Sequence, residues 1–558
     1  MKKIAFLICM IGAALASSMA GTVVDSNIAA SEHWTKEGSP YHLVGVVYVE
    51  PGATLTIDAG VVVATFVKDD GSLAITRGAK FYVNGTQDEP VIFTSAEDVA
   101  TWKGSVVTNN GPNGTVDSIT TLGDPKTGTW RPVCNEWGSI AIMGQALISG
   151  SHYKGAQQSY QDGYSAPVVE NSKFPDGLTK KQMEGLDADA PGDPKVLYGG
   201  DDDNDDSGSI SYLSLRYGGK QGSDINKELN GLSLGGVGRG TTIDHVEIMN
   251  NVDDGIEIWG GTVELEYVNI WNIGDDSFDI DEGWRGKARY GLIVQGYSND
   301  ESQGSGIGDN CIEHDGAEDS DAQPVTTGVI SNFTCIGQPA AGDGGTAWRD
   351  NCRMQYDSCV WMNIGEELVR FDGDDGDGAQ GYGYNGTLTW EQTWATSASQ
   401  TSSVNAISPV PAPGSFNHPD VLYTAQDPAG KLAQIKNSVF FANAVDEDDQ
   451  ADAVGVYDPA NNNVTAAVPP IKNIVRGAPV VAGGKTMLPV EYIDPCASGD
   501  AAAKGAGAFK ANENWIVGWT AADAFGFVDS SSVKRTDVNR DGEVDLLDLA
   551  DMSADWLM

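Results

Sequence analysis

The chain has 558 residues, of which 79 are Asp or Glu and 34 are Lys or Arg, and its formal net charge is −45 at pH 7. This charge argues against nucleic acid as a partner, because the phosphate backbone requires a basic surface. An acidic surface instead suits divalent cations. The length allows one large solenoid or several ordinary domains.

The first twenty residues have the order of a secretory signal. Lys2 and Lys3 precede an apolar run from Ile4 to Ala16, and small residues continue to Ala20. This order predicts a signal peptide over residues 1–20, with cleavage after Ala20. No later stretch reaches the roughly 18 apolar residues of a membrane span. We therefore expect a secreted or cell-surface protein without a membrane span.

Short runs rich in Val, Ile and Phe fill the region from Tyr41 to Ser95, and Gly, Pro and Asp separate them. Strands of this length at this spacing indicate an all-β chain. We expect the strand-rich body to cover residues 21–529. The stretches near 100–207 and 372–435 lack this periodicity and are predicted to be insertions, and residues 530–558 form a separate tail.

An internal repeat specifies the architecture. Thr241–Gly261 aligns with Val263–Gly283 at an offset of 22 residues, and the alignment matches Val246 with Val268, Ile248 with Ile270 and Asp254 with Asp276. A fixed period of this size is typical of a solenoid, whose coils stack strands roughly 4.8 Å apart. The repeat predicts a right-handed, single-stranded parallel β-helix.

Six cysteines remain after the predicted cleavage, and this even number permits three disulfides in an oxidising compartment. Three of them, Cys311, Cys335 and Cys359, recur every 24 residues. This spacing predicts either an interior stack at the coil repeat or disulfide partners.

Several segments resemble a widespread family of secreted bacterial, pectate-lyase-like β-helix proteins. They are Val49–Ile57, Glu136–Ile140, Glu228–Gly238, Asp254–Val263 and Asn514–Thr520. The family has no settled activity, so the resemblance implies the fold and export without naming a reaction.

The C-terminal tail contains a predicted calcium loop at residues 537–548. Side-chain oxygens occupy loop positions 1, 3, 5, 9 and 12, and Gly542 stands at position 6, as calcium loops of the EF-hand type require. The predicted ligands are Asp537, Asn539, Asp541, Glu543, Asp545 and Asp548. An acidic tail without metal is the alternative.

Asp548 at the last loop position resembles the dockerin version of this loop, where sensor EF-hands have Glu. Dockerins carry two such repeats, and one is visible here. The resemblance implies a cohesin-like module as a partner of the tail.

Two neighbouring coils carry acidic motifs, Asn251–Ile258 and Ile273–Ile280. They resemble motifs of the polygalacturonase family, which implies Asp275 as a general acid and Asp254 and Asp276 as residues that activate water. Carboxylates stacked one coil apart repel one another, and this repulsion raises one pKa so that an acid and a base coexist. The sequence lacks that family's Gly-His-Gly and Arg-x-Lys motifs after this pair.

Two other interpretations of these aspartates remain open. They either cap turns by bonding backbone amides or hold a structural calcium between coils, or they support calcium-assisted lyase chemistry. Trp259, Trp271, Trp284 and Trp361 are candidate platforms for sugar rings or, alternatively, interior aromatics.

The sequence thus supports two hypotheses on function. The one we favour slightly is an exported, calcium-binding surface or matrix protein that binds extracellular polysaccharide without catalysis. The other is a polysaccharide-degrading enzyme, either an inverting hydrolase or a calcium-assisted lyase.

Overall fold

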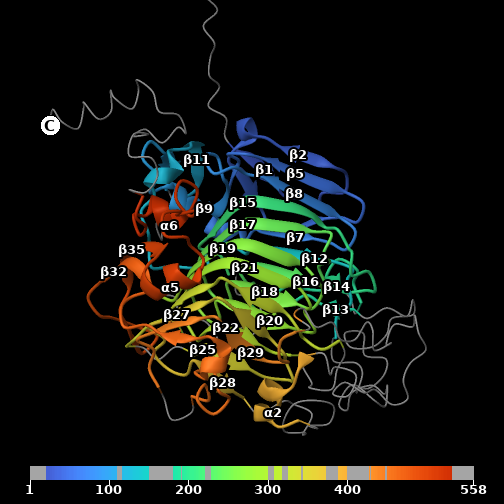
Figure 1. The fold of residues 1–558 in the computed structure, drawn as a ribbon. Coiled ribbons are helices and arrows are strands. Elements are labelled where there is room, and N and C mark those ends of the chain that lie inside the picture. Colours follow the sequence, from blue (N-terminus) through green and yellow to red (C-terminus); the bar gives the residue numbers. More distant parts are fainter. Residues whose placement is uncertain are drawn as a thin grey trace, which may run out of the picture.

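A computed structural model of the chain gives the fold (Figure 1). The predicted signal peptide and the predicted calcium loop at 537–548 lie outside the described residues. The structure describes residues 21–109, 116–149, 180–189, 192–219, 228–298, 307–316, 324–340, 344–372, 388–398, 427, 429–445 and 449–530.

The body is built of coils that each contribute strands to three faces. In one early coil, β4 (Val46–Val49), β5 (Thr54–Asp58) and β6 (Val62–Thr65) follow one another around the axis. Each pairs in parallel with the corresponding strand of the next coil, which are β7 (Ser72–Ile75), β8 (Lys80–Asn84) and β9 (Val91–Ser95). This pairing confirms the predicted parallel β-helix.

The first face is a nine-stranded sheet that runs the length of the solenoid. Its strands alternate between apolar residues that point into the core and residues that point outward, as a sheet with one buried face requires. In order, the strands are β4, β7, β12 (Ile140–Met143), β16 (Leu232–Gly235), β18 (Ile256–Trp259), β20 (Phe278–Asp281), β22 (Asn310–His314), β25 (Gly344–Trp348) and β28 (Val369–Phe371).

The second and third faces share four long strands in the middle of the solenoid. Each of these strands bends from the second face to the third at a residue with a positive φ, namely Tyr212, His245, Tyr267 or Tyr290. The long strands are β15 (Gly208–Arg216), β17 (Thr242–Asn251), β19 (Glu264–Ile273) and β21 (Lys287–Val294).

Earlier and later coils use two separate strands for these faces. Besides β5 and β8, the second face then contains β2 (Glu32–Trp34), β23 (Val329–Ser331), β26 (Gln355–Asp357) and β29 (Gln434–Lys436). Besides β6 and β9, the third contains β1 (Thr22–Val24), β3 (Tyr41–Leu43), β24 (Thr334–Ile336), β27 (Val360–Met362), β30 (Val439–Phe441) and β31 (Val464–Thr465).

The predicted 22-residue register is confirmed. Val246 pairs with Val268 and Ile248 with Ile270 between β17 and β19. Ile256 pairs with Phe278 between β18 and β20.

Cys311, Cys335 and Cys359 lie in the interior core, as one of the two alternatives predicted, but their 24-residue spacing does not mark a coil. Cys335 pairs with Trp361 in the next coil, and Cys311 lies on the first face instead of the third. Insertions between the strands lengthen these coils, so a constant sequence spacing no longer returns to the same position. The predicted disulfides are absent from the structure, in which all six described cysteines are buried thiols.

The predicted insertion near 100–207 is interrupted by a coil strand, because β12 pairs with β7 and β16 in the first face. Around it lie α1 (Ala96–Val99) and two antiparallel pairs, β10 (Val106–Thr108) with β11 (Ser118–Thr121) and β13 (Lys181–Gln182) with β14 (Leu197–Tyr198). Most of the predicted insertion near 372–435 lies outside the described residues; its described part includes α2 (Trp390–Ala395).

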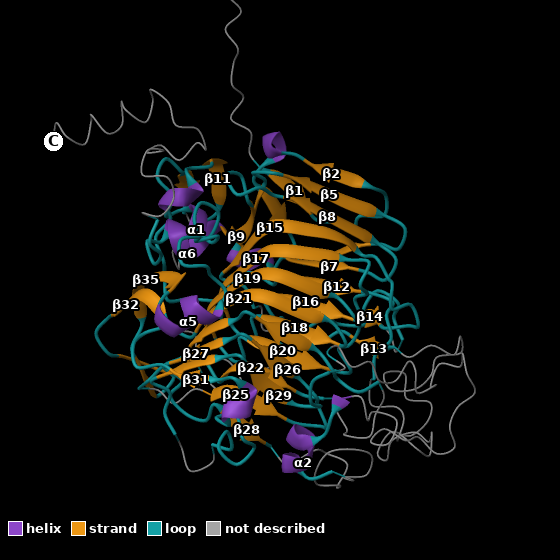
Figure 2. Ribbon diagram, viewed as in Figure 1, coloured by secondary structure: helices purple, strands orange, loops and turns teal. Residues whose placement is uncertain are grey.

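Residues 466–530 do not continue the coils, which end at β31. They lie along the third face (Figure 2) and pack on its outward apolar side chains, among them Met249, Trp271 and Met362. We call this segment the C-terminal cover. It contains β32 (Ile471–Arg476), β33 (Val480–Ala482), β34 (Lys485–Met487), β35 (Val490–Ala497), α5 (Gly499–Lys504) and α6 (Ala521–Ala524).

A buried carboxylate attaches the cover to the solenoid. Glu247 of β17 points outward and accepts hydrogen bonds from the backbone N–H groups of Ala521 (2.6 Å) and Ala522 (3.0 Å) at the start of α6. Ser214 and Asn269 from the neighbouring coils donate to the same carboxylate.

Among the described helices, none is long and apolar enough to cross a membrane.

Candidate functional site

The predicted aspartates lie beside the outward side of the first face, where the middle coils enter β18 and β20. Ile256 and Ile258 of β18 point into the core, so Glu257 between them points outward. Glu257 pairs in register with Asp279 of β20, and Asp279 with Glu313 of β22. Three carboxylates therefore form a column with one member per coil.

The turns that precede these strands form a ladder of side-chain to backbone hydrogen bonds. The N–H of Asp254 donates to Asn230 Oδ1 (3.1 Å), and the N–H of Asp276 donates to Asp254 Oδ1 (2.9 Å). The N–H of Asn310 in turn donates to Asp276 Oδ1 (2.6 Å). One oxygen of each aspartate thus secures the turn of the next coil, which is the capping role considered from the sequence.

Carboxylate oxygens of the turns and of the column converge in three overlapping groups, in each of which one oxygen per residue lies within 4.8 Å of the others. We call these groups together the carboxylate stack. The groups are Asp253, Asp254 and Asp275; Asp254, Glu257 and Asp279; and Asp275, Asp276 and Asp309.

The structure therefore brings the three predicted residues, Asp254, Asp275 and Asp276, into one site. It adds Asp253, Glu257, Asp279 and Asp309, which sequence reasoning did not assign to a site. Glu257 and Asp279 carry a signal that was available in the sequence, because they are acidic at the same position of the 22-residue repeat. Asp309 carries none, since an insertion precedes it.

Burial dominates the electrostatics of the stack. The side chains of Asp254 and Asp276 are 8% and 3% exposed. Loss of hydration raises the pKa of both carboxyls well above its usual range, and the neighbouring carboxylates raise it further. The pKa values of Asp253, Glu257 and Asp279 are raised for the same two reasons.

A guanidinium lies at one edge of the stack. Arg349 contacts Glu313 at 3.0 Å and Asp315 at 3.2 Å, and its Nε donates to Asp372 (3.1 Å). Burial nevertheless raises the pKa of Glu313 to about 7. One arginine shared by three carboxylates does not neutralise the stack, so protons or a cation must compensate the remaining charge.

The donor set fits a calcium ion. It consists of carboxylate oxygens, the ligands that this hard cation prefers, and Asp254 belongs to two of the three groups. The same geometry is unfavourable for inverting hydrolysis, which needs about 6.5–9.5 Å between acid and base. Oxygens of Asp254 and Asp275 lie within 4.8 Å of each other.

Three basic side chains that follow the acidic motifs in the sequence, Arg285, Arg289 and His314, do not reach the stack. Arg285 donates to Asp203 (2.8 Å), and Arg289 pairs with Glu266 on the second face. His314 points into the core, where its Nε2 meets the Tyr356 hydroxyl and its ring packs against Trp348. These side chains therefore do not form a binding site for a substrate carboxylate.

The four tryptophans proposed as sugar platforms are buried aromatics instead. Trp284 and Trp361 lie inside the coils, and Trp271 stacks on Phe527 of the cover (5.6 Å). Trp259 is outward but packs near Tyr198 at 6.1 Å. Each is at most 4% exposed, so none offers a free face to a polymer.

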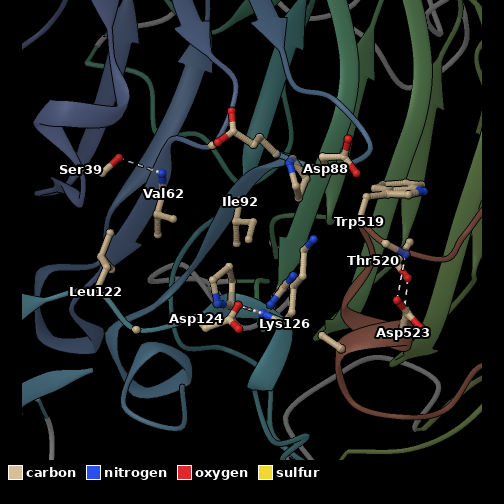
Figure 3. A pocket seen from close by; sticks show the side chains of 18 of the residues that line it. Ser39, Val62, Asp88, Ile92, Leu122, Asp124, Lys126, Trp519, Thr520 and Asp523 are labelled. Carbon is tan, nitrogen blue, oxygen red and sulfur yellow. Dashed lines mark hydrogen bonds between the residues drawn. The ribbon is translucent and has the colours of Figure 1, made fainter. Parts of the chain in front are cut away.

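A pocket of about 400 Å³ lies far from the stack, between the third face of the first coils and the cover (Figure 3). Its walls include Val62, Ile92, Leu122 and Trp519. Several polar groups at its edge already bind backbone amides of the chain. Ser39 Oγ accepts from Val62 (3.0 Å), Asp124 from Lys126 (2.9 Å) and Thr520 from Asp523 (3.1 Å).

Comparison with known proteins agrees with this architecture. The sequence matches a family described as a pectate-lyase-like β-helix domain, over residues 27–124 and 184–410. No curated protein and no solved structure matches the chain significantly. Because the family match covers more than half of the chain, the protein belongs to the pectate-lyase-like β-helix family.

Proposed function

We propose that the protein binds an acidic extracellular polysaccharide through calcium held by the carboxylate stack, and that it does so without catalysis. The observation that carries this proposal is the convergence of buried carboxylates in three overlapping groups, with oxygens within 4.8 Å of one another. In the absence of a cation, this arrangement requires protonation of groups that are ordinarily ionised at neutral pH.

Calcium also resolves the conflict between the protein's charge and an acidic ligand. A net charge of −45 repels a polyanion. A calcium ion that is incompletely coordinated by the protein accepts oxygens from a uronic acid, since calcium takes 6–8 oxygen ligands. The membership in a pectate-lyase-like family supports a polysaccharide as the ligand.

The roles of Asp254 and Asp276 in the turn ladder support binding over catalysis. Each has one oxygen engaged by a backbone amide and is almost fully buried. A general acid or base must instead reach the proton that it transfers.

The C-terminal loop is proposed as a second calcium site, with Asp537, Asn539, Asp541, Glu543, Asp545 and Asp548 as ligands. Its dockerin-like spacing supports a cohesin-like module as partner. The predicted signal peptide supports a secreted or cell-surface location.

A polysaccharide hydrolase or lyase is the second candidate. It is favoured by one observation, namely that Asp253 and Asp275 are only partly buried while the pKa of Asp253 is raised well above its usual range. A raised carboxyl pKa in an accessible position is typical of catalytic acids.

Calcium titration by calorimetry tests the proposal. The starting protein carries Asp537→Ala and Asp541→Ala and is stripped with a chelator, so that the C-terminal loop contributes no heat. We expect it to bind calcium and, only then, to retain polygalacturonate. Asp254→Asn and Asp279→Asn should weaken calcium binding at least tenfold, and Asp25→Asn, an exposed control, should not.

The alternatives have distinct outcomes. Absence of calcium heat in the loop-deficient protein would refute a metal site in the stack. Calcium binding together with release of reducing ends or unsaturated products, lost in Asp275→Asn, would establish the enzyme instead.

A further inference from the structure

A column of aromatic rings follows the bend between the second and third faces. Tyr212 stacks on His245 with 4.2 Å between ring centroids, and His245 stacks on Tyr267 at 4.4 Å. Tyr267 stacks on Tyr290 at 5.1 Å, with 18° between the ring planes. Each ring comes from one coil, so the coil repeat of roughly 4.8 Å sets a stacking distance suitable for aromatic rings.

The column ends after Tyr290, because the residue at the next bend is Asn332. A cleft of about 460 Å³ lies at this end of the column, which is within the range of small-molecule sites. Tyr267, Tyr290 and Asn332 form its solenoid side, and residues of the cover between 497 and 515 form the other side. The cleft is distinct from the carboxylate stack, which lies along the first face.

The cleft combines aromatic surface with polar groups. Trp515 lines it and meets Tyr267 edge-on at 5.4 Å between ring centroids, and Phe509, which also lines the cleft, stacks on Trp515 at 5.2 Å. Tyr267 and Tyr290 are half-buried, and within the described part of the chain their hydroxyls make no hydrogen bond. The hydroxyls are therefore available to a ligand.

The charges of the cleft compensate each other. Lys510 and Glu513 line it and form an ion pair of 2.7 Å. The ligand that fits is therefore uncharged, has a flat apolar face for an aromatic ring and carries hydroxyl groups. A pyranose ring of a neutral glycan has these properties.

We propose that this cleft is a calcium-independent binding site for a neutral glycan, in which one sugar ring stacks on Tyr290 as the next member of the aromatic column. Trp515 forms the adjoining wall, and the hydroxyls of Tyr267 and Tyr290 bond to sugar hydroxyls. This site goes beyond the proposed function, since its ligand, its face of the solenoid and its independence of calcium all differ.

Titrations in a chelator test this site. The probes are the β-1,4-linked hexasaccharides of glucose, xylose and mannose, with hexagalacturonate as the acidic comparison, and the readouts are calorimetry and tryptophan fluorescence. We expect at least one neutral hexasaccharide to bind and to change the fluorescence, since Trp515 lines the cleft. Hexagalacturonate should not bind under these conditions.

Two variants and a matched control complete the test. Ala502 is an exposed residue of α5 that lines the cleft, so Ala502→Phe should fill it and weaken binding at least tenfold. Ala503 is exposed on the same helix outside the cleft lining, and Ala503→Phe should bind as wild type does. Tyr290→Ala should also weaken binding at least tenfold.

The assignment would be overturned if no neutral hexasaccharide saturated the protein at a concentration of 10 millimolar. It would also be overturned if Ala502→Phe bound the sugar as tightly as wild type does. Calcium-free binding of hexagalacturonate in place of neutral sugars would also overturn it. Because the titrations contain chelator, and Asp254→Asn should bind the neutral sugar normally, their result is independent of the calcium proposal.

Discussion

Replacing Asp254 by Asn should have opposite effects on stability with and without calcium. Asn retains an oxygen that accepts the N–H of Asp276, now bonded at 2.9 Å, so the turn ladder remains. The substitution removes only the charge. In a chelator this should stabilise the protein, because Asp254 contributes repulsion to two of the three carboxylate groups. In calcium it should destabilise the protein, because a ligand is lost.

The size of the effect follows from the separation of the oxygens. Two ionised carboxylates 4.8 Å apart repel each other by about 3.5 kcal/mol at an effective dielectric constant of about 20. Proton uptake limits this cost, so we expect Asp254→Asn to gain about 2–3 kcal/mol in a chelator at pH 8. Asp254→Ala also leaves the Asp276 N–H without its acceptor, which costs about 1–3 kcal/mol in both conditions.

Thermal unfolding of wild type, Asp254→Asn, Asp254→Ala and Asp25→Asn checks this prediction, each in chelator and in calcium. All proteins should carry the Asp537→Ala and Asp541→Ala changes, so that calcium acts through the solenoid alone. The reasoning would be refuted if Asp254→Asn melted at a higher temperature than wild type in both conditions, or at a lower temperature in both. Asp25→Asn should follow wild type throughout.

Three further predictions concern the scaffold. Glu247→Gln should lower the free energy of unfolding by about 2–4 kcal/mol. Glu247 accepts hydrogen bonds from four donors, and the N–H of a glutamine side chain would point at one of them. Trypsin should therefore cleave the cover faster in this variant than in the exposed control Glu264→Gln. Burial lowers the pKa of His314 to about 3; the stability that this neutral imidazole contributes is full above pH about 6.5 and is lost as pH falls toward 3, by up to about 5 kcal/mol. His314→Phe should therefore flatten the dependence of the melting temperature on pH below about 6.5, and an unchanged slope would contradict the assignment. The six buried cysteine thiols should react with a thiol reagent only after denaturation, and reducing agent should leave the melting temperature unchanged.

The central coils could be predicted in detail from the sequence because they contain no insertions. Between Val246 and Ile280 the apolar core positions and the two aspartate pairs recur at the offset of one coil, and the predicted strand pairs are the observed ones. The same regularity placed Asp254 and Asp276 together. Predicting these coils required only the comparison of neighbouring segments, and no contact between distant parts of the chain had to be known.

Where loops vary in length, the sequence pattern was misleading. The cysteine spacing suggested a coil of 24 residues, but Cys335 lies opposite Trp361. A strand of four residues such as β12, placed between long irregular stretches, carries too little periodicity to be recognised. The C-terminal cover was also unpredicted, because its position depends on contacts such as that between Glu247 and Ala521, which are far apart in sequence.

The location of the carboxylate stack has a physical reason in this regularity. A ladder in which each turn's side chain accepts the next turn's N–H requires that successive coils repeat without offset, as they do from Asn230 through Asp254 to Asp276. Aspartate serves this ladder with one oxygen and presents a second oxygen outside it in each of two successive coils. The ladder begins at Asn230, which supplies its acceptor with an amide in place of a carboxylate. Asparagine supplies the turn acceptor without charge, so the turn alone does not explain why aspartate stands in the next two coils. Binding of a cation by the second carboxylate oxygen would explain the choice of aspartate. The stability of Asp254→Asn with and without calcium measures the contribution of this oxygen directly.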